Sequence, residues 1–595
     1  MTEAAGRITS DSRAPHDGMA ARWALWVAAA VIVGLVHLAF TVGPRIALAS
    51  DPLWRLPVED MSMFVLGGEA FLREPAWHFP IATTGRLLSG GAPVSIVYTD
   101  SAPWLAIAIK ALGLQVDTVS VVGVIAVLSV LLQPVAVALL LVALDVRRAE
   151  SLLIGIALGS LLPAWYQRLV WHVAVSSHWL IVLALALAAL AIRRGVSWWI
   201  VSAFAALGAL SIGVHAYLFV MVAAVAAGAM LSDVARVGKA ATFRAIVGIA
   251  LFLAASGLSA WILGYRGGGG VGGFGRFSMN ALSPVVPQMS GLTQLLIGTP
   301  RWFLDATGRQ YEGFNYLGAG ILLCIGVAAI LLWRGRRTWP VWRPALPLVA
   351  ALVGLTLFAL SHKIYVRHTL VLSVPLPARA LTVLNELRSS GRMFWPVAYA
   401  LLAGAVLVLD RFARRAVSAT VLTAALLLQV VDTSVLRSRL RQAYRPNPSL
   451  RPVFDATAFQ SGGALVGRDL RVLPSFLCLV YDHETARQAA LAVERGDGVV
   501  EGGPVARFDP ALCQRAEIER ALLEPRAPHR LDLLFTRSVP PELLQRVRES
   551  AACTAEEGAY LCDYGAPAST KSPQRVSADA QSVSPRRPAH IGALR

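Results

Sequence analysis

The chain has 595 residues, of which 56% are hydrophobic and 15% are charged, and its mean hydropathy is +0.59. Soluble domains carry about 25% charged residues, so this composition indicates a membrane protein and excludes a secreted globular enzyme, a disordered protein and a single-pass receptor. The formal net charge of +18 would suit a nucleic-acid partner. Most of the basic residues lie between apolar stretches, however, and we expect no nucleic-acid partner.

About eleven windows approach the roughly 20 apolar residues that a membrane span needs. The count can differ by one or two, because the stretch from Trp198 to Leu231 is compatible with two spans joined at His215 or with one long span, and the window 151–165 is short. The windows lie near residues 23–42, 119–145, 151–165, 177–192, 198–213, 215–232, 244–264, 316–333, 344–361, 393–409 and 417–433. The sequence therefore predicts a mainly α-helical, polytopic membrane protein.

The first window has a competing interpretation as a cleavable signal peptide, because Ala47-Leu48-Ala49 matches the small-residue cleavage pattern. The length of its apolar core and the number of windows that follow favour a membrane span.

Basic residues are concentrated in every second connection, all of them short. They are Arg147, Arg148, Arg193, Arg194, Arg236, Lys239, Arg244, Arg334, Arg336, Arg337, Arg343, Arg411, Arg414 and Arg415. Short loops rich in Lys and Arg stay in the cytoplasm. The N-terminal segment 1–22 is then cytoplasmic, while the long first loop 43–118, the glycine-rich loop 265–315, the loop 362–392 and the chain after the last span lie outside. We expect the inner membrane of a bacterium.

The polar region 434–565 is predicted to be a small extracytoplasmic α/β domain, and the segment 566–595 a disordered tail. Strand-like runs at 470–480, 529–537 and 559–563 alternate with helix-like runs near 485–495, 511–524 and 540–553. The transmembrane domain then covers residues 23–433.

Four of the five cysteines lie in this C-terminal region, which indicates disulfides in an oxidising compartment. We expect Cys553 to pair with Cys562, because a short turn would join a helix-like run ending near the first to the strand carrying the second. Cys478 would then pair with Cys513. No spacing is a CxxC, so no metal ligands are assigned.

The first external loop carries an acidic pair, Glu59-Asp60, directly before an amphipathic helix-like run. Met61, Phe64, Val65, Phe71 and Leu72 would give this helix an apolar face, as in an interfacial helix. A carboxylate at a helix start can simply be an N-cap, so composition leaves a structural and a catalytic role open.

These features resemble the GT-C superfamily of glycosyltransferases, which includes protein mannosyltransferases and the aminoarabinose and arabinofuranosyl transferases. The resemblance rests on the acidic pair, the helix after it and the run SAPWLAIAIKALG at residues 101–113. More closely, the segments EDMSMFVLGGEAFLREPAWHFP, IVYTDSAPWLAIAIKAL, GGFGRFSMNALSPVVP, YEGFNYLGAGIL and RSSGRMFWPVAYALL resemble an uncharacterised bacterial family of polytopic proteins catalogued as a domain of unknown function.

The resemblance implies a polyprenyl-phosphate-sugar lipid as donor, an extracytoplasmic acceptor and an external active site among membrane lipids. Asp60 is the position that would act as general base, with Glu59 as the alternative. The resemblance establishes no cofactor and leaves open whether the enzyme uses a divalent metal ion.

Glycosyl transfer also needs cations that stabilise the departing lipid phosphate. Candidates on the outer face are Arg276, Lys363, Arg367, Arg388 and Arg392, of which Arg388 and Arg392 share the RSSGR run at the start of a span. Polar groups that could contact substrate on the same face are His78, Asp100, His215 and Glu312, with Asp100 in YTDS the most promising.

Two other functions are open. One is a transporter or flippase of lipid-linked sugars, which would place polar groups at mid-membrane depth and show internal repeats. The other is an oligosaccharide polymerase or ligase, which would place its essential arginines in a large late loop. The acid in the first loop favours the glycosyltransferase.

Overall fold

A computed structural model of the chain describes residues 14–57, 60–266, 272–298, 304–335, 342–446, 466–479, 483–506, 510–524, 529–556 and 558–564. These residues form two compact units. The first takes the described residues within 1–85, 93–298 and 304–451, and the second takes those within 86–92 and 452–595. The predicted tail 566–595 and Glu59 lie outside the described residues.

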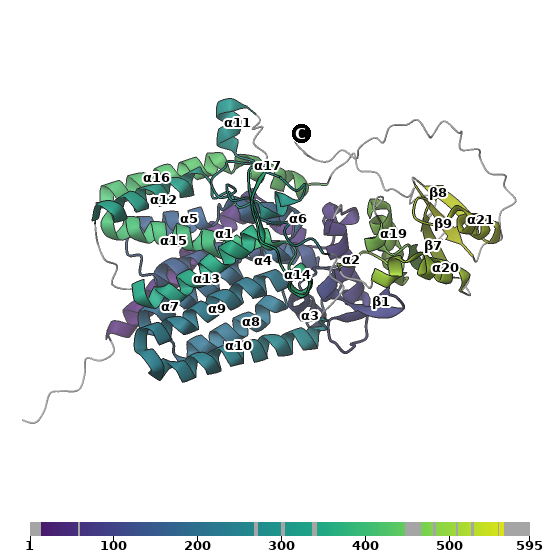
Figure 1. Cartoon of the computed structure of the whole chain (residues 1–595), viewed down its shortest axis with the longest axis horizontal. Coiled ribbons are helices and arrows are strands. Elements are labelled where there is room, and N and C mark those ends of the chain that lie inside the picture. The colour runs from purple at the N-terminus through teal and green to yellow at the C-terminus, as the bar shows by residue number, and fades with distance from the viewer. Residues whose placement is uncertain are drawn as a thin grey trace, which may run out of the picture. The chain divides into compact units, whose positions relative to one another are not determined.

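The first unit is a bundle of long helices with short helices between them (Figure 1). The helices are α1 (Ala14–Phe40), α2 (Asp60–Arg73), α3 (Pro103–Ala111), α4 (Val121–Ala143), α5 (Ala149–Gly159), α6 (Pro163–Trp171), α7 (Trp179–Arg194), α8 (Trp198–Ile212), α9 (Ala216–Val237), α10 (Thr242–Leu263), α11 (Gly291–Ile297), α12 (Ala319–Gly335), α13 (Trp342–Leu360), α14 (Ala378–Asn385), α15 (Trp395–Phe412), α16 (Arg415–Asp432) and α17 (Ser434–Ala443). The 3-10 turns are η1 (Pro44–Ala47), η2 (Pro52–Arg55), η3 (Ile96–Tyr98), η4 (Ala174–Ser176), η5 (Gly238–Ala241), η6 (Gln310–Gly313) and η7 (Ser390–Phe394).

Eight helical stretches among the described residues are long and apolar enough to cross a membrane, and the stretch Ala216–Leu263 contains both α9 and α10. The helices α8 and α12 are apolar but shorter, at 15 and 17 residues. Each of the eleven predicted windows contains a helix, although the number eleven stays a prediction. The short window 151–165 ends as α5 gives way to α6 at Pro163, which has no amide to continue the helical hydrogen bonds.

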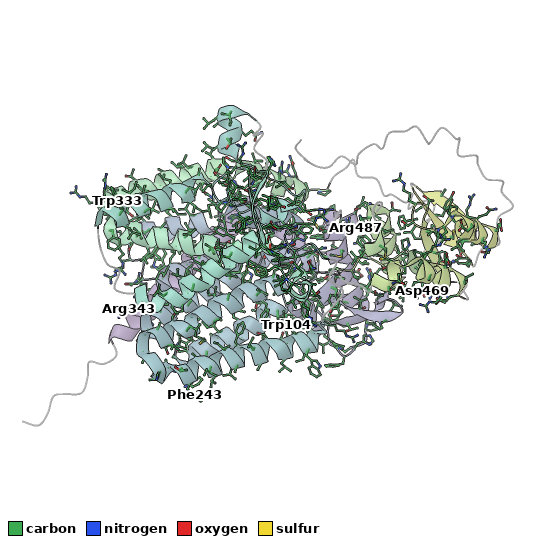
Figure 2. The ribbon with its side chains drawn as sticks, in the orientation of Figure 1. Trp104, Phe243, Trp333, Arg343, Asp469 and Arg487 are labelled. Atoms are coloured by element: carbon green, nitrogen blue, oxygen red, sulfur yellow. A yellow bond between two sulfur atoms is a disulfide. The ribbon has the colours of Figure 1, made fainter. Side chains whose placement is uncertain are left out.

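Large apolar side chains cover the outside of the bundle. Phe243 at the start of α10 and Trp333 near the end of α12 point away from it (Figure 2) and are 71% and 78% exposed. Water-soluble proteins rarely expose so much contiguous apolar surface, whereas a bilayer accepts it and holds aromatic side chains at its boundary. The chain is therefore a multi-pass helical membrane protein, as predicted.

Small residues set how closely the helices pack. Gly159 of α5 faces Val137 of α4, and a Cβ at Gly159 would lie 2.7 Å from a Val137 methyl. Close packing through small residues is the usual source of helix association in a membrane, where apolar burial gives no advantage over lipid.

The second unit contains a mixed sheet of seven strands in the order β2-β1-β6-β5-β7-β9-β8, and its helices are α19 (His483–Arg495), α20 (Arg515–Leu523) and α21 (Pro541–Ser550). The strands are β1 (Thr83–Ser89), β2 (Ala92–Ser95), β5 (Asp469–Leu473), β6 (Val500–Glu501), β7 (Arg530–Phe535), β8 (Ala552–Glu556) and β9 (Ala559–Asp563). β1, β6, β5 and β7 are parallel, and β7, β9 and β8 are antiparallel. The α/β prediction is confirmed.

The sheet also includes a strand from the loop 43–118, which the sequence did not indicate. Leu87 and Leu88 of β1 pair with Val500 and Glu501 of β6. A strand of two residues has no readable alternation, and its partner lies more than 400 positions away, so no local pattern could reveal the pair.

Both predicted disulfides are present, Cys478–Cys513 and Cys553–Cys562, and Cys324 is a buried free thiol in α12. One detail of the expectation was wrong. Cys553 lies on β8, directly opposite Cys562 of β9, rather than at a helix end, because α21 stops at Ser550. The bonds support an extracytoplasmic position for this unit.

Topology can be tested with one cysteine in the loop 43–118 and one at the end of α7. Its 16 residues span about 24 Å, with Arg193 bound to Asp145 at one end and η4 at the other. In spheroplasts, we expect a membrane-impermeant maleimide to label Arg45→Cys of the first external loop at once, and Arg194→Cys only after permeabilisation. Unlabelled wild-type protein is the control, because Cys324 is buried. The reverse labelling pattern would place the loop 43–118 in the cytoplasm.

Candidate functional site

Asp60 is the first residue of α2, and its side chain is 43% exposed. Its Oδ2 lies 3.9 Å from Nε2 of His172. The apolar face of α2 is buried within the first unit, including Met61, Phe64 and Phe71. The expected interfacial helix is therefore a protein-packed one, and this packing fixes where Asp60 stands.

Glu312 is the centre of a buried charge cluster. Its Oε2 accepts hydrogen bonds from Nη1 of Arg168 at 2.7 Å and from Nε of Arg392 at 2.9 Å, while its Oε1 lies 3.3 Å from Nε2 of His172. The side chains of Glu312, Arg168 and Arg392 are 5%, 2% and 6% exposed. Because His172 also faces Asp60, one imidazole lies between a buried carboxylate and an exposed one.

Two glycines let the backbones that carry Glu312 and Arg392 meet. A Cβ on Gly391 would lie 2.5 Å from the Cα of Gly313, so neither position tolerates a side chain without a shift. Asn315 closes the contact by donating to the carbonyl of Gly391 at 2.8 Å. The close contact between these two backbones explains the glycines of the YEGFN and SSGR segments.

Charge compensation keeps Glu312 ionised. Burial alone would raise the pKa of its carboxyl, but Arg168, Arg392 and His172 lower it, and the net result is a pKa well below the usual range. Tyr311 beside it shows the opposite effect, since burial and the charges of Glu312 and Asp60 raise its pKa.

Asp100 forms a second acid-histidine pair. Its Oδ1 lies 3.3 Å from Nε2 of His215, whose Nδ1 accepts the backbone N–H of Tyr217 at 3.1 Å. Since Nδ1 is an acceptor, the imidazole proton sits on Nε2 and points at Asp100. Burial would raise the pKa of Asp100, but His215, His172 and Arg392 bring it below its usual value.

The loop before α3 is strained where it presents this acid. Asp100 and Ala102 have φ values of 53° and 43°, a region that non-glycine residues rarely adopt. Ser101 between them holds the loop against α2 by donating to the carbonyl of Phe64 at 2.9 Å. The Asp100 pair and the Glu312 cluster adjoin, because the Arg392 guanidinium lies 4.8 Å over the Tyr217 ring.

The cluster also has buried polar atoms without a hydrogen-bond partner among the described residues. They are Arg168 Nε, His172 Nδ1, Ser390 Oγ and Trp395 Nε1. Unpaired buried donors cost free energy unless a polar ligand or water meets them.

Other predicted residues lie apart from the charge cluster. His78 Nε2 lies 3.7 Å from Oε2 of Glu74, four positions earlier in the segment after α2. Arg276 is exposed, and Arg388 lies 5.3 Å over the ring of Phe277, which a second arginine, Arg309, also covers at 5.9 Å. Of the predicted set, Asp60, Asp100, Glu312 and Arg392 therefore converge.

The sequence reasoning missed Arg168 and His172, and it noted His215 without assigning it a partner. A signal was present, because the turn at 167–177 places Gln, Arg and His between two apolar windows. No group of three or more His, Cys, Asp or Glu side chains suited to a metal ion occurs in the described part of the chain.

Residues 30–434 match the model of a family described as a domain of unknown function, DUF6311, so the chain belongs to that family. The match contains every residue of the charge cluster and ends before residue 452, where the C-terminal part of the second unit begins. No curated protein matches the chain.

Neutralising Glu312 should destabilise the protein. Glu312→Gln leaves Arg168 and Arg392 buried without a counter-charge, and breaking such a cluster costs about 3–5 kcal/mol. Because the folded pKa is lowered, the contribution of Glu312 is complete above its unfolded pKa of about 4.3 and is lost as pH falls through the folded value. Thermal unfolding in detergent should therefore show a lower midpoint for Glu312→Gln at neutral pH.

The matched control is Glu150→Gln, which breaks an exposed pair with Arg415 and should change the midpoint far less. Equal midpoints for Glu312→Gln and wild type would show that Glu312 does not hold the cluster.

Proposed function

We propose that this member of the DUF6311 family is a GT-C-type membrane glycosyltransferase, which moves a sugar from a polyprenyl-phosphate donor to an acceptor on the outer face of a bacterial inner membrane. The observation that carries the proposal is an exposed carboxylate, Asp60, held beside a buried cluster of arginine, histidine and acid at one end of a membrane bundle. The second unit would lie on the same, extracytoplasmic side.

Exposure decides which of the three acids is the base. Glu312 is 5% exposed and bound by two arginines, and Asp100 is 21% exposed and faces His215. Asp60 is 43% exposed. An acceptor hydroxyl would therefore reach Asp60 most easily, while Glu312 would position His172 beside it and Asp100 would position His215.

The proposed reaction balances without a further reactant. An acceptor oxygen attacks the anomeric carbon of the donor as Asp60 takes the hydroxyl proton. A new C–O bond forms, the bond between the anomeric carbon and the phosphate oxygen breaks, and the polyprenyl phosphate leaves with the electron pair. His172, 3.9 Å from Asp60, would orient the carboxylate and stabilise its charge.

The arginines divide into two groups by burial. Arg392 is 6% exposed and committed to Glu312, so a phosphate would have to displace a buried carboxylate to bind it. Arg309 and Arg388 are exposed and lie over one ring, Phe277, next to Tyr311. Two guanidinium groups at one aromatic ring suit a phosphate, which arginine binds through paired hydrogen bonds.

A transporter of lipid-linked sugars stays a second candidate because of one observation. Buried polar groups continue from the cluster into the bundle: the Arg168 guanidinium lies 5.7 Å over Trp395, and His178 contacts both Trp395 and the hydroxyl of Tyr399. Intramembrane polar groups often mark a substrate path. Pools of lipid-linked sugar in a deletion strain distinguish the two, since loss of a transferase leaves its donor on the outer face and loss of a flippase leaves it inside.

The base assignment is tested by Asp60→Asn in a complemented deletion strain. Asparagine keeps the size and hydrogen bonding of Asp60 but cannot accept a proton, so transfer should fall about 10²- to 10⁴-fold while expression and folding persist. The measurement is envelope glycan together with accumulated lipid-linked sugar. Asp117→Asn is the control, because Asp117 is 81% exposed in the same external loop.

Full activity of Asp60→Asn together with loss in Glu59→Gln would move the base by one residue. Full activity of both variants would refute the transferase mechanism.

The phosphate site is tested with the double variant Arg309→Gln/Arg388→Gln and a polyprenyl monophosphate as probe. Each lost charge-assisted hydrogen bond is worth about 1.5–3 kcal/mol, so affinity should fall at least about tenfold. Native mass spectrometry of the detergent-solubilised protein measures the bound fraction. Arg45→Gln, an exposed arginine of the first external loop, should bind like wild type. Unchanged binding by the double variant would exclude these arginines.

A further inference from the structure

The segment that follows α13 exposes apolar side chains along its whole length. β3 (Lys363–Val366) and β4 (Thr369–Ser373) form a two-stranded antiparallel hairpin with Arg367 and His368 at its turn, and α14 follows. None of residues 363–384 is buried, and α14 buries no side chain. Val371, Leu372 and Val383 are 62%, 50% and 70% exposed.

A two-stranded hairpin of this kind is marginal in water by itself. Leu370 and Val374 extend the exposed apolar surface on either side of Val371 and Leu372. Such a contiguous patch is uncommon on a protein that faces water, and it indicates a partner surface.

Chain continuity identifies the partner as the membrane. α13 is a candidate span whose side chains are mostly uncovered by protein, such as Val353 at 52% and Leu357 at 58% exposed. The hairpin begins at Lys363, three residues after α13 ends, so it lies at the depth where the span leaves the lipid. The segment 361–385 carries Lys363, Arg367 and Arg379 and no acidic residue, which suits anionic headgroups.

The turn of the hairpin is tied to the candidate site. Asn280 donates to the carbonyl of Arg367 at 2.7 Å and lies 3.4 Å from Gln310, two residues before Glu312. At the other end, Asn385 accepts the backbone N–H of Phe274 at 3.0 Å. The segment is thus held at the hairpin turn and at the end of α14, while Val371, Leu372 and Val383 stay exposed among the described residues.

We propose that residues 363–384 form a lipid-docking element, which inserts the apolar side chains around Val371, Leu372 and Val383 into the outer leaflet and places Lys363, Arg367 and Arg379 at anionic headgroups. The proposal depends on the membrane position of α13 and not on glycosyl transfer, so it can hold whichever reaction the site performs.

Spin labels on the full chain in liposomes containing phosphatidylglycerol test the insertion. The variants are Val371→Cys and Val383→Cys in a Cys324→Ala background. We expect both labels to be more accessible to oxygen than to a water-soluble nickel chelate, as at Val353→Cys of α13. Leu523→Cys is the aqueous control, because Leu523 is 70% exposed in the second unit. Water-like accessibility at Val371 and Val383, matching Leu523, would overturn the proposal.

A second readout separates lipid from protein cover. Spin–spin broadening between copies at Val371→Cys would show that a second copy covers the hairpin, and would also overturn the proposal. If lipid covers the hairpin, the triple variant Lys363→Gln/Arg367→Gln/Arg379→Gln should reduce the oxygen preference of the Val371 label. Liposomes of phosphatidylcholine alone should reduce the oxygen preference equally in the protein that keeps these three charges. Full retention of the oxygen preference in both cases would refute the role of anionic headgroups.

Discussion

The charge cluster around Glu312 is the interaction on which one end of the helix bundle depends. One carboxylate joins Arg168 of α6 and Arg392 of η7, which are 144 and 80 positions away in the chain. Taking these ions out of water is costly, and the mutual attraction offsets that cost only when every partner is in place. The cluster therefore helps to fix how α6, η6 and η7 meet, beside the apolar packing of residues such as Trp165 and Met393.

Environment gives chemically similar groups different roles at this site. The charge of Glu312 is compensated by arginine, and its side chain is buried. Asp60 is the first residue of α2, whose packing leaves the Asp60 carboxylate exposed. The arginines divide in the same way, since Arg392 is used inside the protein and Arg388 lies at the surface over Phe277. Residue type alone would give Asp60 the same role as Glu312, and Arg388 the same role as Arg392. The difference in burial indicates different roles within each pair.

Sequence was most informative where the physics is local. Apolar length located the helices, and the oxidising side of the membrane indicated the two disulfides. The sequence placed Asp60, Asp100, Glu312 and Arg392 on one face, but it indicated neither that these four adjoin nor which partners they have. Arg168 lies in the short helix α6 and His172 directly follows it, and nothing in that sequence indicates which other segment the two side chains meet. The direction of the α2 apolar face was also undetermined, because an amphipathic helix packs equally well on protein or on lipid.

The 272–280 segment connects the features that a lipid substrate would have to meet. Arg309 and Arg388 lie over the ring of Phe277, and the carbonyl of Phe277 accepts the N–H of Gly391. Asn280 donates to the carbonyl of Arg367 at the turn of the hairpin. Gly391 in turn packs on Gly313, next to Glu312. A shift of the hairpin with the lipid surface would therefore act on the arginines and on the charge cluster through the same short stretch of backbone. The membrane would then help to set the position of the site as well as to deliver its substrate.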